Sequence, residues 1–174
     1  VSTLSPYTTL FRSTGVNVNG GFAEYVILRE NWTTRIPESL ATIEAAPLLC
    51  AGVAAYSAVL KANLKPGELV LVFGVGGLGA YAIQHAKLSG ARVAVVDIDD
   101  AKLKLAADLG SDYTFRTDDN FVETVQSLGG ANACFNFAPV ASTWQKMLAS
   151  SAPRGVWDLS RFLLVPFVFE RPQL

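Results

Sequence analysis

Short apolar runs alternate with longer amphipathic segments through the middle of the chain. Such runs predict strands that are buried on both faces of a sheet, and they lie at Leu69–Phe73, Arg92–Val96, Tyr113–Phe115 and Ala133–Phe137. Each of the first three is followed by a segment of helical periodicity that ends at a glycine; these segments are Leu78–Ser89, Ala101–Leu109 and Phe121–Leu128. Regular alternation of strand and helix predicts an α/β fold with a doubly wound parallel sheet and right-handed crossovers.

The pattern before this alternation is less regular. Gly20 and Gly21 mark a turn, and Phe22–Leu28 is typical of a strand. The apolar stretch Ala45–Leu60 predicts a buried core helix, for which Thr42 can serve as the cap. This stretch is shorter than the roughly 20 residues that a membrane-spanning helix needs, so we expect no membrane span.

The sequence FGVGGLG, from Phe73 to Gly79, stands between the first predicted strand and the first predicted helix. This is the context that a dinucleotide-binding fingerprint requires. Gly74 allows a tight turn, Gly76 lets a pyrophosphate approach the backbone, and Gly79 lets the helix pack close to the sheet. The free N–H groups and the dipole at the start of the helix favour phosphate binding. We therefore expect a fold of the Rossmann type.

An aspartate, Asp97, ends the second predicted strand in the sequence VAVVDIDD. From this position an acid accepts hydrogen bonds from the adenosine ribose of a dinucleotide. Its charge repels a 2′-phosphate, and no Lys or Arg follows directly to bind one. The sequence therefore favours NAD over NADP as the cofactor.

Composition and charge exclude several classes of protein. The 174 residues predict one domain and at most part of a second. Hydrophobic residues make up 51% and charged residues 17%, so the chain has enough apolar surface to fold. A formal net charge of −1 gives no electrostatic attraction to nucleic acid or to an anionic membrane. Two cysteines, Cys50 and Cys134, are too few for a disulfide scaffold and favour a reduced, cytoplasmic setting.

Four segments of the chain, taken together and in order, resemble the zinc-dependent alcohol dehydrogenases of the medium-chain dehydrogenase/reductase superfamily. They are GGFAEYV (Gly20–Val26), AAPLLCAGVAAY (Ala45–Tyr56), GVGGLG (Gly74–Gly79) and VDIDDAKLKLAADLG (Val96–Gly110). The resemblance implies an oxidoreductase that transfers a hydride between NAD and an alcohol, aldehyde or ketone. It also implies a zinc ion that polarises the substrate oxygen, and a parent protein that is a homo-oligomer.

The resemblance assigns roles to individual residues. Cys50 matches a ligand of the catalytic zinc, although a single cysteine in an apolar helix is by itself more often a small core residue. His85, on the helix after the glycine loop, is expected to be structural rather than a substitute ligand. The residues that match cofactor-binding positions are Gly74, Val75, Gly76, Gly77, Leu78, Gly79, Asp97, Lys102, Phe137 and Ala138.

The match also predicts how the chain is organised. We expect residues 1–13 to be a non-native leader, residues 14–45 to be the end of a mostly β, GroES-like catalytic domain, and residues 46–174 to be the NAD-binding domain. The family's other catalytic zinc ligands and its cysteine cluster for a structural zinc have no counterpart in this sequence. One thiolate does not hold zinc tightly, so we expect a fragment that is inactive alone.

The tail departs from the family pattern. A helix over Ser142–Ser151 and a turn at Pro153–Gly155 are expected, but Asp158 and Arg161 then fall where the family has a buried strand. The apolar segment Phe162–Phe169 is interrupted by a proline. A frameshift after about residue 155 would produce this pattern. We expect the sixth strand to be absent, which would leave an open sheet edge.

Other functions stay open on the sequence alone. A zinc-free quinone or enoyl reductase of the same superfamily would share the fold and use NADPH, although Cys50 and Asp97 count against it. A nucleotide-binding module without catalysis would hold NAD through Gly74–Gly79. A Rossmann-like methyltransferase is disfavoured by the spacing and flanks of the glycine loop. Relative affinities for NADH, NADPH and S-adenosylmethionine would separate these functions.

Overall fold

The structure, a computed structural model, describes residues 14–117, 120–138, 140, 142–158 and 168–170. The chain divides into two compact units, Val1–Leu40 and Ala41–Leu174. The predicted leader at residues 1–13 lies outside the described residues, as do Arg161 and most of the segment Phe162–Phe169. The predicted domain division at residue 45 stays a prediction.

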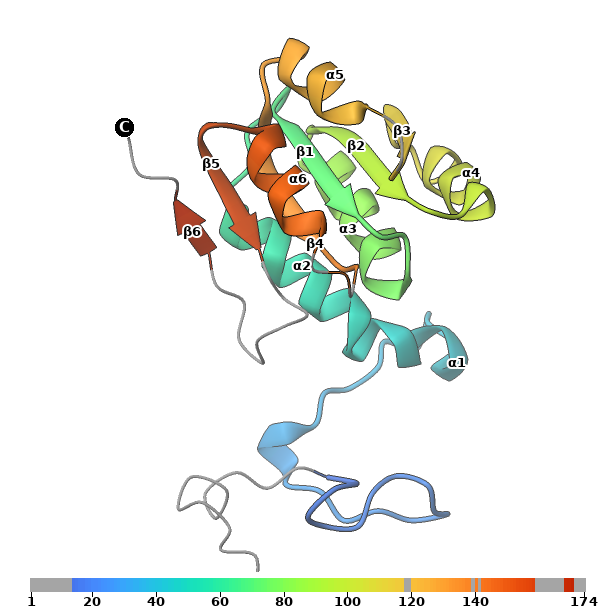
Figure 1. The fold of residues 1–174 in the computed structure, drawn as a ribbon. Helices are drawn as coiled ribbons and strands as arrows, with labels where there is room; N and C mark the ends of the chain where they lie inside the picture. The colour runs from blue at the N-terminus through green and yellow to red at the C-terminus, as the bar shows by residue number, and fades with distance from the viewer. Residues whose placement is uncertain (1–13, 118–119, 139, 141, 159–167, 171–174) are drawn as a thin grey trace, which may run out of the picture. The chain divides into compact units, whose positions relative to one another are not determined.

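Six strands of the second unit form one sheet in the order β3-β2-β1-β4-β5-β6 (Figure 1). They are β1 (Leu69–Phe73), β2 (Arg92–Asp97), β3 (Tyr113–Arg116), β4 (Ala131–Asn136), β5 (Ser151–Asp158) and β6 (Val168–Glu170). The first five are parallel, and β6 runs antiparallel to β5. This is the strand order of the dinucleotide-binding Rossmann fold, so the predicted α/β fold with a doubly wound parallel sheet is confirmed.

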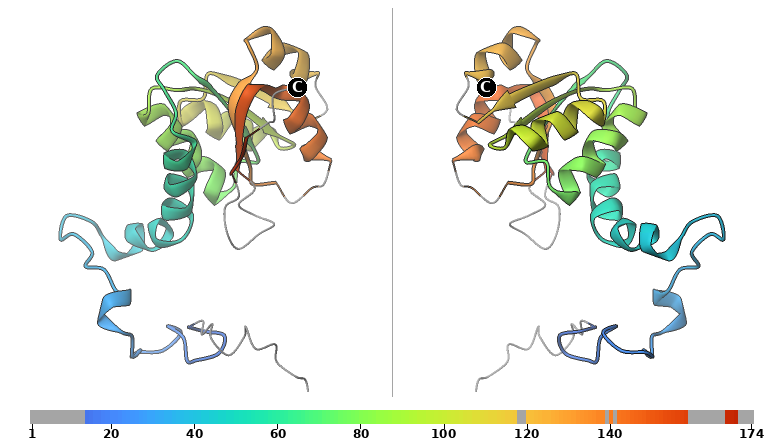
Figure 2. Two further views of the ribbon diagram at one scale, coloured as in Figure 1. Left: turned by 90° about the vertical axis from the view of Figure 1, so that its left-hand side faces the viewer. Right: turned by 90° about the vertical axis from the view of Figure 1, so that its right-hand side faces the viewer.

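Helices cover both faces of the sheet, as Figure 2 shows. One face carries α2 (Ala51–Ala62), α3 (Gly77–Leu88) and α4 (Asp100–Asp108), and the other carries α5 (Phe121–Ser127) and α6 (Thr143–Ser150). Successive residues of β1 alternate between the two cores, with Val70 and Val72 on the α2–α3 face and Leu71 on the α5–α6 face. All of β1 is buried, which explains its continuous apolar run.

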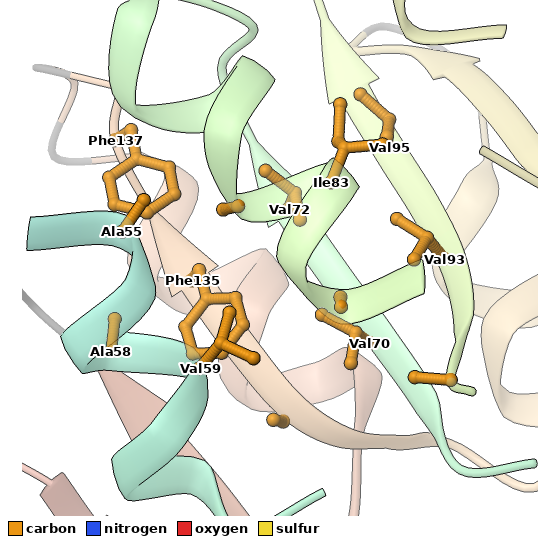
Figure 3. Packing of buried hydrophobic residues seen from close by; sticks show 14 of the residues in the cluster. Ala55, Ala58, Val59, Val70, Val72, Ile83, Val93, Val95, Phe135 and Phe137 are labelled. Carbon is orange, nitrogen blue, oxygen red and sulfur yellow. The ribbon is translucent and has the colours of Figure 1, made fainter. Parts of the chain in front are cut away.

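Small residues on α2 let this helix pack closely on the sheet. Ala55, Ala58 and Val59 lie against Phe135 and Phe137, whose rings are stacked with their centroids 6.4 Å apart (Figure 3). Close packing of this kind is sensitive to changes of a single methyl group. The alanine-rich sequence of α2 is therefore a packing requirement of the α2–α3 face.

The segment predicted as one buried helix is broken and only partly buried. It forms α1 (Thr42–Ala45), the 3-10 turn η2 (Ala46–Leu49) and α2, with a bend of 47° before α2. Pro47 lies in η2, where its missing N–H cannot continue α-helical hydrogen bonding. Thr42 is the first helical residue rather than the cap. Val53 and Leu60 are exposed because only one face of α2 meets the sheet.

No single helix within the described residues is long and apolar enough to cross a membrane. The segments Thr42–Leu49 and Ala51–Ala62, which meet at a bend of 47°, reach the length and apolar composition of a membrane span only when they are taken together.

In the first unit, the predicted strand at Phe22–Leu28 is wrong. Residues 14–40 contain an isolated bridge between Thr14 and Val18 and the 3-10 turn η1 (Glu30–Trp32), but no strand. The side chains of Phe22 and Ile27 are fully exposed. A strand needs a hydrogen-bonded neighbour and a buried face, and this segment has neither among the described residues.

The end of the sheet also differs from the expectation. The residues expected to form a turn, Pro153–Gly155, lie within β5. The pairing of β5 with β4 shifts register between Ala131 and Ala133. Over this stretch β5 contains more residues than β4, and the additional residues form a bulge-like irregularity. The position expected to be empty next to β5 is filled by β6. Pairing uses backbone groups alone, so an extended segment of either direction can cover an open edge.

An ion pair ties the turn before β3 to the neighbouring elements. Asp112 accepts hydrogen bonds from Lys87 Nζ at 2.8 Å and from the Val93 N–H at 2.6 Å. Partial burial opposes ionisation of this carboxyl, but the Lys87 ammonium and the Val93 N–H outweigh that effect, and the pKa of Asp112 is lowered. A carboxyl with a lowered pKa stabilises the fold at neutral pH and loses this contribution as the pH falls.

We expect Asp112→Asn to lower the free energy of unfolding by about 1 kcal/mol at neutral pH, because the ion pair with Lys87, whose two side chains are 33% and 34% exposed, is lost. The deficit should begin to shrink below about pH 4, where the carboxylate of the unfolded chain takes up a proton, and should shrink further as the pH falls through the lowered pKa of Asp112 in the folded chain. Urea unfolding at pH 7 and pH 3 measures both values. Asp108→Asn, at an exposed position of α4, is the control. An equal deficit at both pH values would contradict the role assigned to the ion pair.

Candidate cofactor-binding site

The carboxyl ends of β1, β2 and β4 lie side by side at one edge of the sheet. The chain leaves β1 toward β2 on one side and later returns to β4 on the other, so the carboxyl ends of β1 and β4 form the switch point at which such sheets bind ligands. The glycine loop Gly74–Gly79 follows β1, Asp97 ends β2, and Phe137 and Ala138 follow β4. The fold therefore brings together three groups of residues that the sequence predicts for the cofactor.

Two glycines of the loop are required by its geometry. Gly74 leaves β1 with φ of +88°, in the left-handed region that favours glycine, and its N–H donates to Val96 O at 2.9 Å. A Cβ on Gly79 would overlap the carbonyl oxygen of Gly74. Gly76 differs, since no atom lies within 4 Å of the position that its Cβ would take. The loop is thus closed toward the sheet and open at Gly76.

Asp97 fixes the end of β2 to the glycine loop. This side chain is buried, and its Oδ2 accepts a hydrogen bond from the Val75 N–H at 2.7 Å. Its Oδ1 accepts from the Ile98 N–H at 2.7 Å and from the Asp99 N–H at 3.1 Å. A carboxylate has about four lone-pair sites, so Asp97 can still accept a hydrogen bond from a ligand hydroxyl.

The chain after β4 lies against the glycine turn. The Phe137 N–H donates to Phe73 O at 2.9 Å, and a Cβ on Gly74 would come within 3.2 Å of the Ala138 nitrogen. The Phe137 ring is buried against Ala55 in the core (Figure 3), so the backbone of Phe137 borders the loop while its side chain packs inward. Its contact with a cofactor stays a prediction. Pro139, the next residue along the chain, lies outside the described residues.

A buried polar network at the end of β4 is a feature that the sequence interpretation missed. Asn136 Oδ1 accepts from the Ala138 N–H at 3.1 Å, and its Nδ2 donates to Thr143 Oγ1 at 2.9 Å. The Thr143 hydroxyl in turn donates to Val140 O at 2.6 Å. The network orders the chain between β4 and α6 next to the glycine turn. The sequence contains one indication of this network, which is an asparagine in a strand buried on both faces. A buried polar side chain requires hydrogen-bond partners.

The other predicted residues lie around this edge with different exposure. Val75 is buried in the core on the α2–α3 face, and Leu78 packs partly against the same core. Lys102 is exposed in the first turn of α4. Cys50 is exposed at the junction of η2 and α2.

The described residues do not form a zinc site on their own. Among them, no group of three or more His, Cys, Asp or Glu side chains is placed to hold a metal ion. Cys50 would supply one ligand, whereas zinc sites use three or four protein ligands. His85 contacts the rings of Tyr56 and Tyr81, with centroid distances of 5.4 and 6.5 Å, as expected for a structural side chain.

The two thiols are expected to differ strongly in reactivity. Burial raises the pKa of the Cys134 thiol to about 12, against a smaller opposing effect of a hydrogen bond with Ser151. Cys50 is exposed. Iodoacetamide should therefore modify Cys50 at least about 100-fold faster than Cys134 in the folded chain, since the thiolate is the reacting form. Peptide mass spectrometry measures both rates, and Cys50→Ser should lack the fast reaction. Equal rates would contradict the buried placement of Cys134.

The chain is similar to known dehydrogenases in sequence and in structure. The family model for "Zinc-binding dehydrogenase" matches residues 77–157. An alcohol dehydrogenase from a Moraxella species is 41% identical over 140 residues, which make up 79% of this chain and 41% of that protein. The structure of the alcohol dehydrogenase from the archaeon Aeropyrum pernix aligns with a TM-score of 0.76 at 34% identity, covering 84% of this chain and 45% of that one. A quinone oxidoreductase from Pseudomonas syringae aligns with a TM-score of 0.66 at 25% identity, covering 71% of this chain and 40% of that one.

The chain spans about two fifths of the length of the curated relatives that it matches. Over that part, the strand order, the glycine loop and the sequence similarity agree with one another. Over the part that it spans, the chain therefore belongs with the alcohol dehydrogenases of the medium-chain dehydrogenase/reductase superfamily.

Proposed function

We propose that this chain forms the cofactor-binding part of an oxidoreductase that transfers a hydride between NAD and an alcohol, aldehyde or ketone. The observation that carries the proposal is the bond between Asp97 and the Val75 N–H, which joins the ribose-binding position to the glycine loop. The similarity to alcohol dehydrogenases supports the reaction class.

The residues at the carboxyl edge of the sheet fit NAD. The first intrahelical bond of α3 runs from the Ala80 N–H to Gly76 O, so the N–H groups of Gly77, Leu78 and Gly79 have no acceptor within their own helix. These groups would donate to the pyrophosphate, and the open space at Gly76 gives it room to approach. Asp97 would accept from a hydroxyl of the adenosine ribose. Bound NAD supplies the hydride acceptor.

The chain's own part in the reaction is to bind and orient the cofactor. The Asn136 network and the backbone of Phe137 hold the chain after β4 against Gly74, which limits the freedom of the backbone at the carboxyl ends of β1 and β4. Rigid placement of a reactant reduces the entropy cost of reaching the transition state. The proposed contribution of these residues is therefore positional.

Zinc dependence is proposed for the complete enzyme rather than for the described residues. Cys50 matches one ligand of the family's catalytic zinc, but further ligands would have to come from outside these residues. The proposal also includes a small alcohol or carbonyl substrate, a cytoplasmic setting and a homo-oligomeric parent protein. It includes no nucleic-acid or membrane partner, in keeping with the net charge of −1.

A zinc-free, NADPH-dependent quinone reductase is the second candidate, because the quinone oxidoreductase from Pseudomonas syringae shares the fold at 25% identity. Asp97 argues against it, since a buried carboxylate at the ribose position repels a 2′-phosphate. A nucleotide-binding module without catalysis is the third candidate, and the glycine loop alone would suffice for it.

Calorimetric titration of the purified chain with NADH, NADPH and S-adenosylmethionine tests the proposal. We expect NADH to bind more tightly than NADPH, and S-adenosylmethionine not to displace it. Tighter binding of NADPH would favour the reductase, and binding of S-adenosylmethionine alone would overturn the dehydrogenase assignment. Alcohol oxidation by a full-length protein that contains this chain, with and without zinc, then separates an enzyme from a binding module.

A further inference from the structure

The buried polar network at the end of β4 holds two points of the chain that follows this strand. Asn136 and Thr143 are only 2% and 4% exposed. Asn136 Oδ1 accepts from the Ala138 N–H at 3.1 Å, and its Nδ2 donates to Thr143 Oγ1 at 2.9 Å. Thr143 is the first residue of α6, and its hydroxyl donates to Val140 O at 2.6 Å. Asn136 therefore fixes the backbone at Ala138 directly and is itself held by α6.

The backbone that Asn136 holds borders the glycine turn. Asn136 is the last residue of β4 and the register partner of Phe73, which is the last residue of β1. A Cβ on Gly74 would come within 3.2 Å of the Ala138 nitrogen, which is the atom whose hydrogen Asn136 accepts. The side chain of Asn136 shares the α5–α6 face of the sheet with Cys134, two residues earlier in β4. The network thus acts from beneath the carboxyl end of β4.

The order of the strands decides which half of a dinucleotide lies at this end of β4. β2 and β4 pair with β1 on opposite sides. The adenosine ribose is proposed to bind at Asp97, after β2, and the pyrophosphate at the start of α3, after β1. A dinucleotide that extends from the end of β2 across the end of β1 continues toward the end of β4. The nicotinamide half would therefore lie beside Ala138.

We propose that Asn136 is a positioning residue for the nicotinamide half of the cofactor, because it holds the Ala138 backbone against the glycine turn. The inference rests on the proposed function, since it requires NAD to bind with its adenosine ribose at Asp97. Both Asn136 and Thr143 are buried, so they act through the backbone that they hold. Without Asn136, the Ala138 N–H loses its acceptor, and ordering this backbone becomes a cost of binding.

ADP provides the test, because it shares the adenosine and the pyrophosphate with NADH and lacks the nicotinamide riboside. By calorimetry, Asn136→Ala should bind NADH about tenfold more weakly than the wild type does, with the affinity for ADP changed less than about twofold. Asn132→Ala is the matched control. Asn132 lies near the other end of β4, where its Oδ1 accepts from the Leu69 N–H at 2.9 Å. This variant should lower the melting temperature but leave the ratio of the two affinities unchanged.

A pair of variants at Thr143 tests the network with Asn136 in place. Thr143→Val keeps the branched shape but removes the hydroxyl, and its NADH affinity should fall about fivefold with little change for ADP. The loss is smaller than in Asn136→Ala because the Thr143 N–H still donates to Val140 O. Thr143→Ser restores the hydroxyl, so its NADH affinity should return to within about twofold of the wild type. This pair decides the question if thermal melts show that Asn136→Ala is unfolded.

An unchanged ratio of NADH to ADP affinity in folded Asn136→Ala would overturn the inference, because the network would then contribute to the stability of the fold alone. Equal NADH affinities for Thr143→Val and Thr143→Ser would overturn it too. The proposed function has a separate readout in the wild type. If the folded wild type binds neither NADH nor ADP, both proposals fall. If it binds NADH no more tightly than ADP, only this inference falls, since the nicotinamide half would then make no favourable contact.

Discussion

Replacing Gly79 by alanine should lower the melting temperature of the chain by about 10 °C and abolish measurable binding of NADH. The added Cβ would overlap the carbonyl oxygen of Gly74. The Gly74 turn cannot move aside, because its N–H is bonded to Val96 O and the Ala138 nitrogen packs close on its other side. The start of α3 must shift instead, which disturbs the packing of Ile83 in the core. Overpacking of this kind costs about 3 kcal/mol.

Gly76→Ala is the matched control for this prediction. The backbone of Gly76 has φ of −91°, which alanine adopts without strain, and its Cβ would meet no atom within 4 Å. The melting temperature should therefore stay within about 2 °C of the wild type. NADH affinity should still fall, because the methyl group enters the space proposed for the pyrophosphate. Circular dichroism melts and calorimetry measure the two effects. Equal melting temperatures for Gly79→Ala and the wild type would contradict the geometry of the turn.

The sequence predicts the centre of the sheet well because local and tertiary preferences agree there. β1 spans the predicted Leu69–Phe73, since an apolar run between a turn and a glycine loop has few alternatives to a doubly buried strand. Phe22–Leu28 shows the limit of the same reasoning. Its pattern is compatible with a strand, but a strand also requires a neighbour, and no local pattern reveals whether one exists.

In the candidate cofactor site, too, features set by local sequence could be predicted, whereas features that depend on tertiary contacts could not. The glycine loop and Asp97 are recognisable because their geometry depends on a short motif and on the end of one strand. The contact between Arg116 and Asp100 depends on the register of β3 against β2, and the Asn136 network depends on where α6 begins. Such contacts join residues whose spacing in the sequence has no fixed relation to their distance in the fold. They therefore become visible only once the strands are paired.

The second large effect is expected at Asp97, which holds the glycine loop in the fold and has a proposed role in binding the cofactor. Asp97→Ala should lower the free energy of unfolding by about 2 kcal/mol, because the Val75 N–H loses its acceptor in a buried position. It should also weaken NADH binding by about 100-fold, since the ribose hydroxyl loses a charged acceptor and the loop loses its anchor. Urea unfolding and calorimetry measure the two quantities on the same samples.

Two further variants separate the roles of this carboxylate. Asp97→Asn retains one oxygen for the Val75 N–H, but its NH₂ group cannot accept from the Ile98 N–H, so its stability should lie between those of wild type and Asp97→Ala. Asp99→Ala removes the neighbouring acid, which caps α4 through the Ala101 N–H at 2.8 Å, and should cost about 1 kcal/mol while leaving NADH affinity nearly unchanged. If Asp99→Ala weakened NADH binding as much as Asp97→Ala, the loss would reflect negative charge near the ribose in general. A loss confined to Asp97 instead ties cofactor binding to the carboxylate that holds the glycine loop in place.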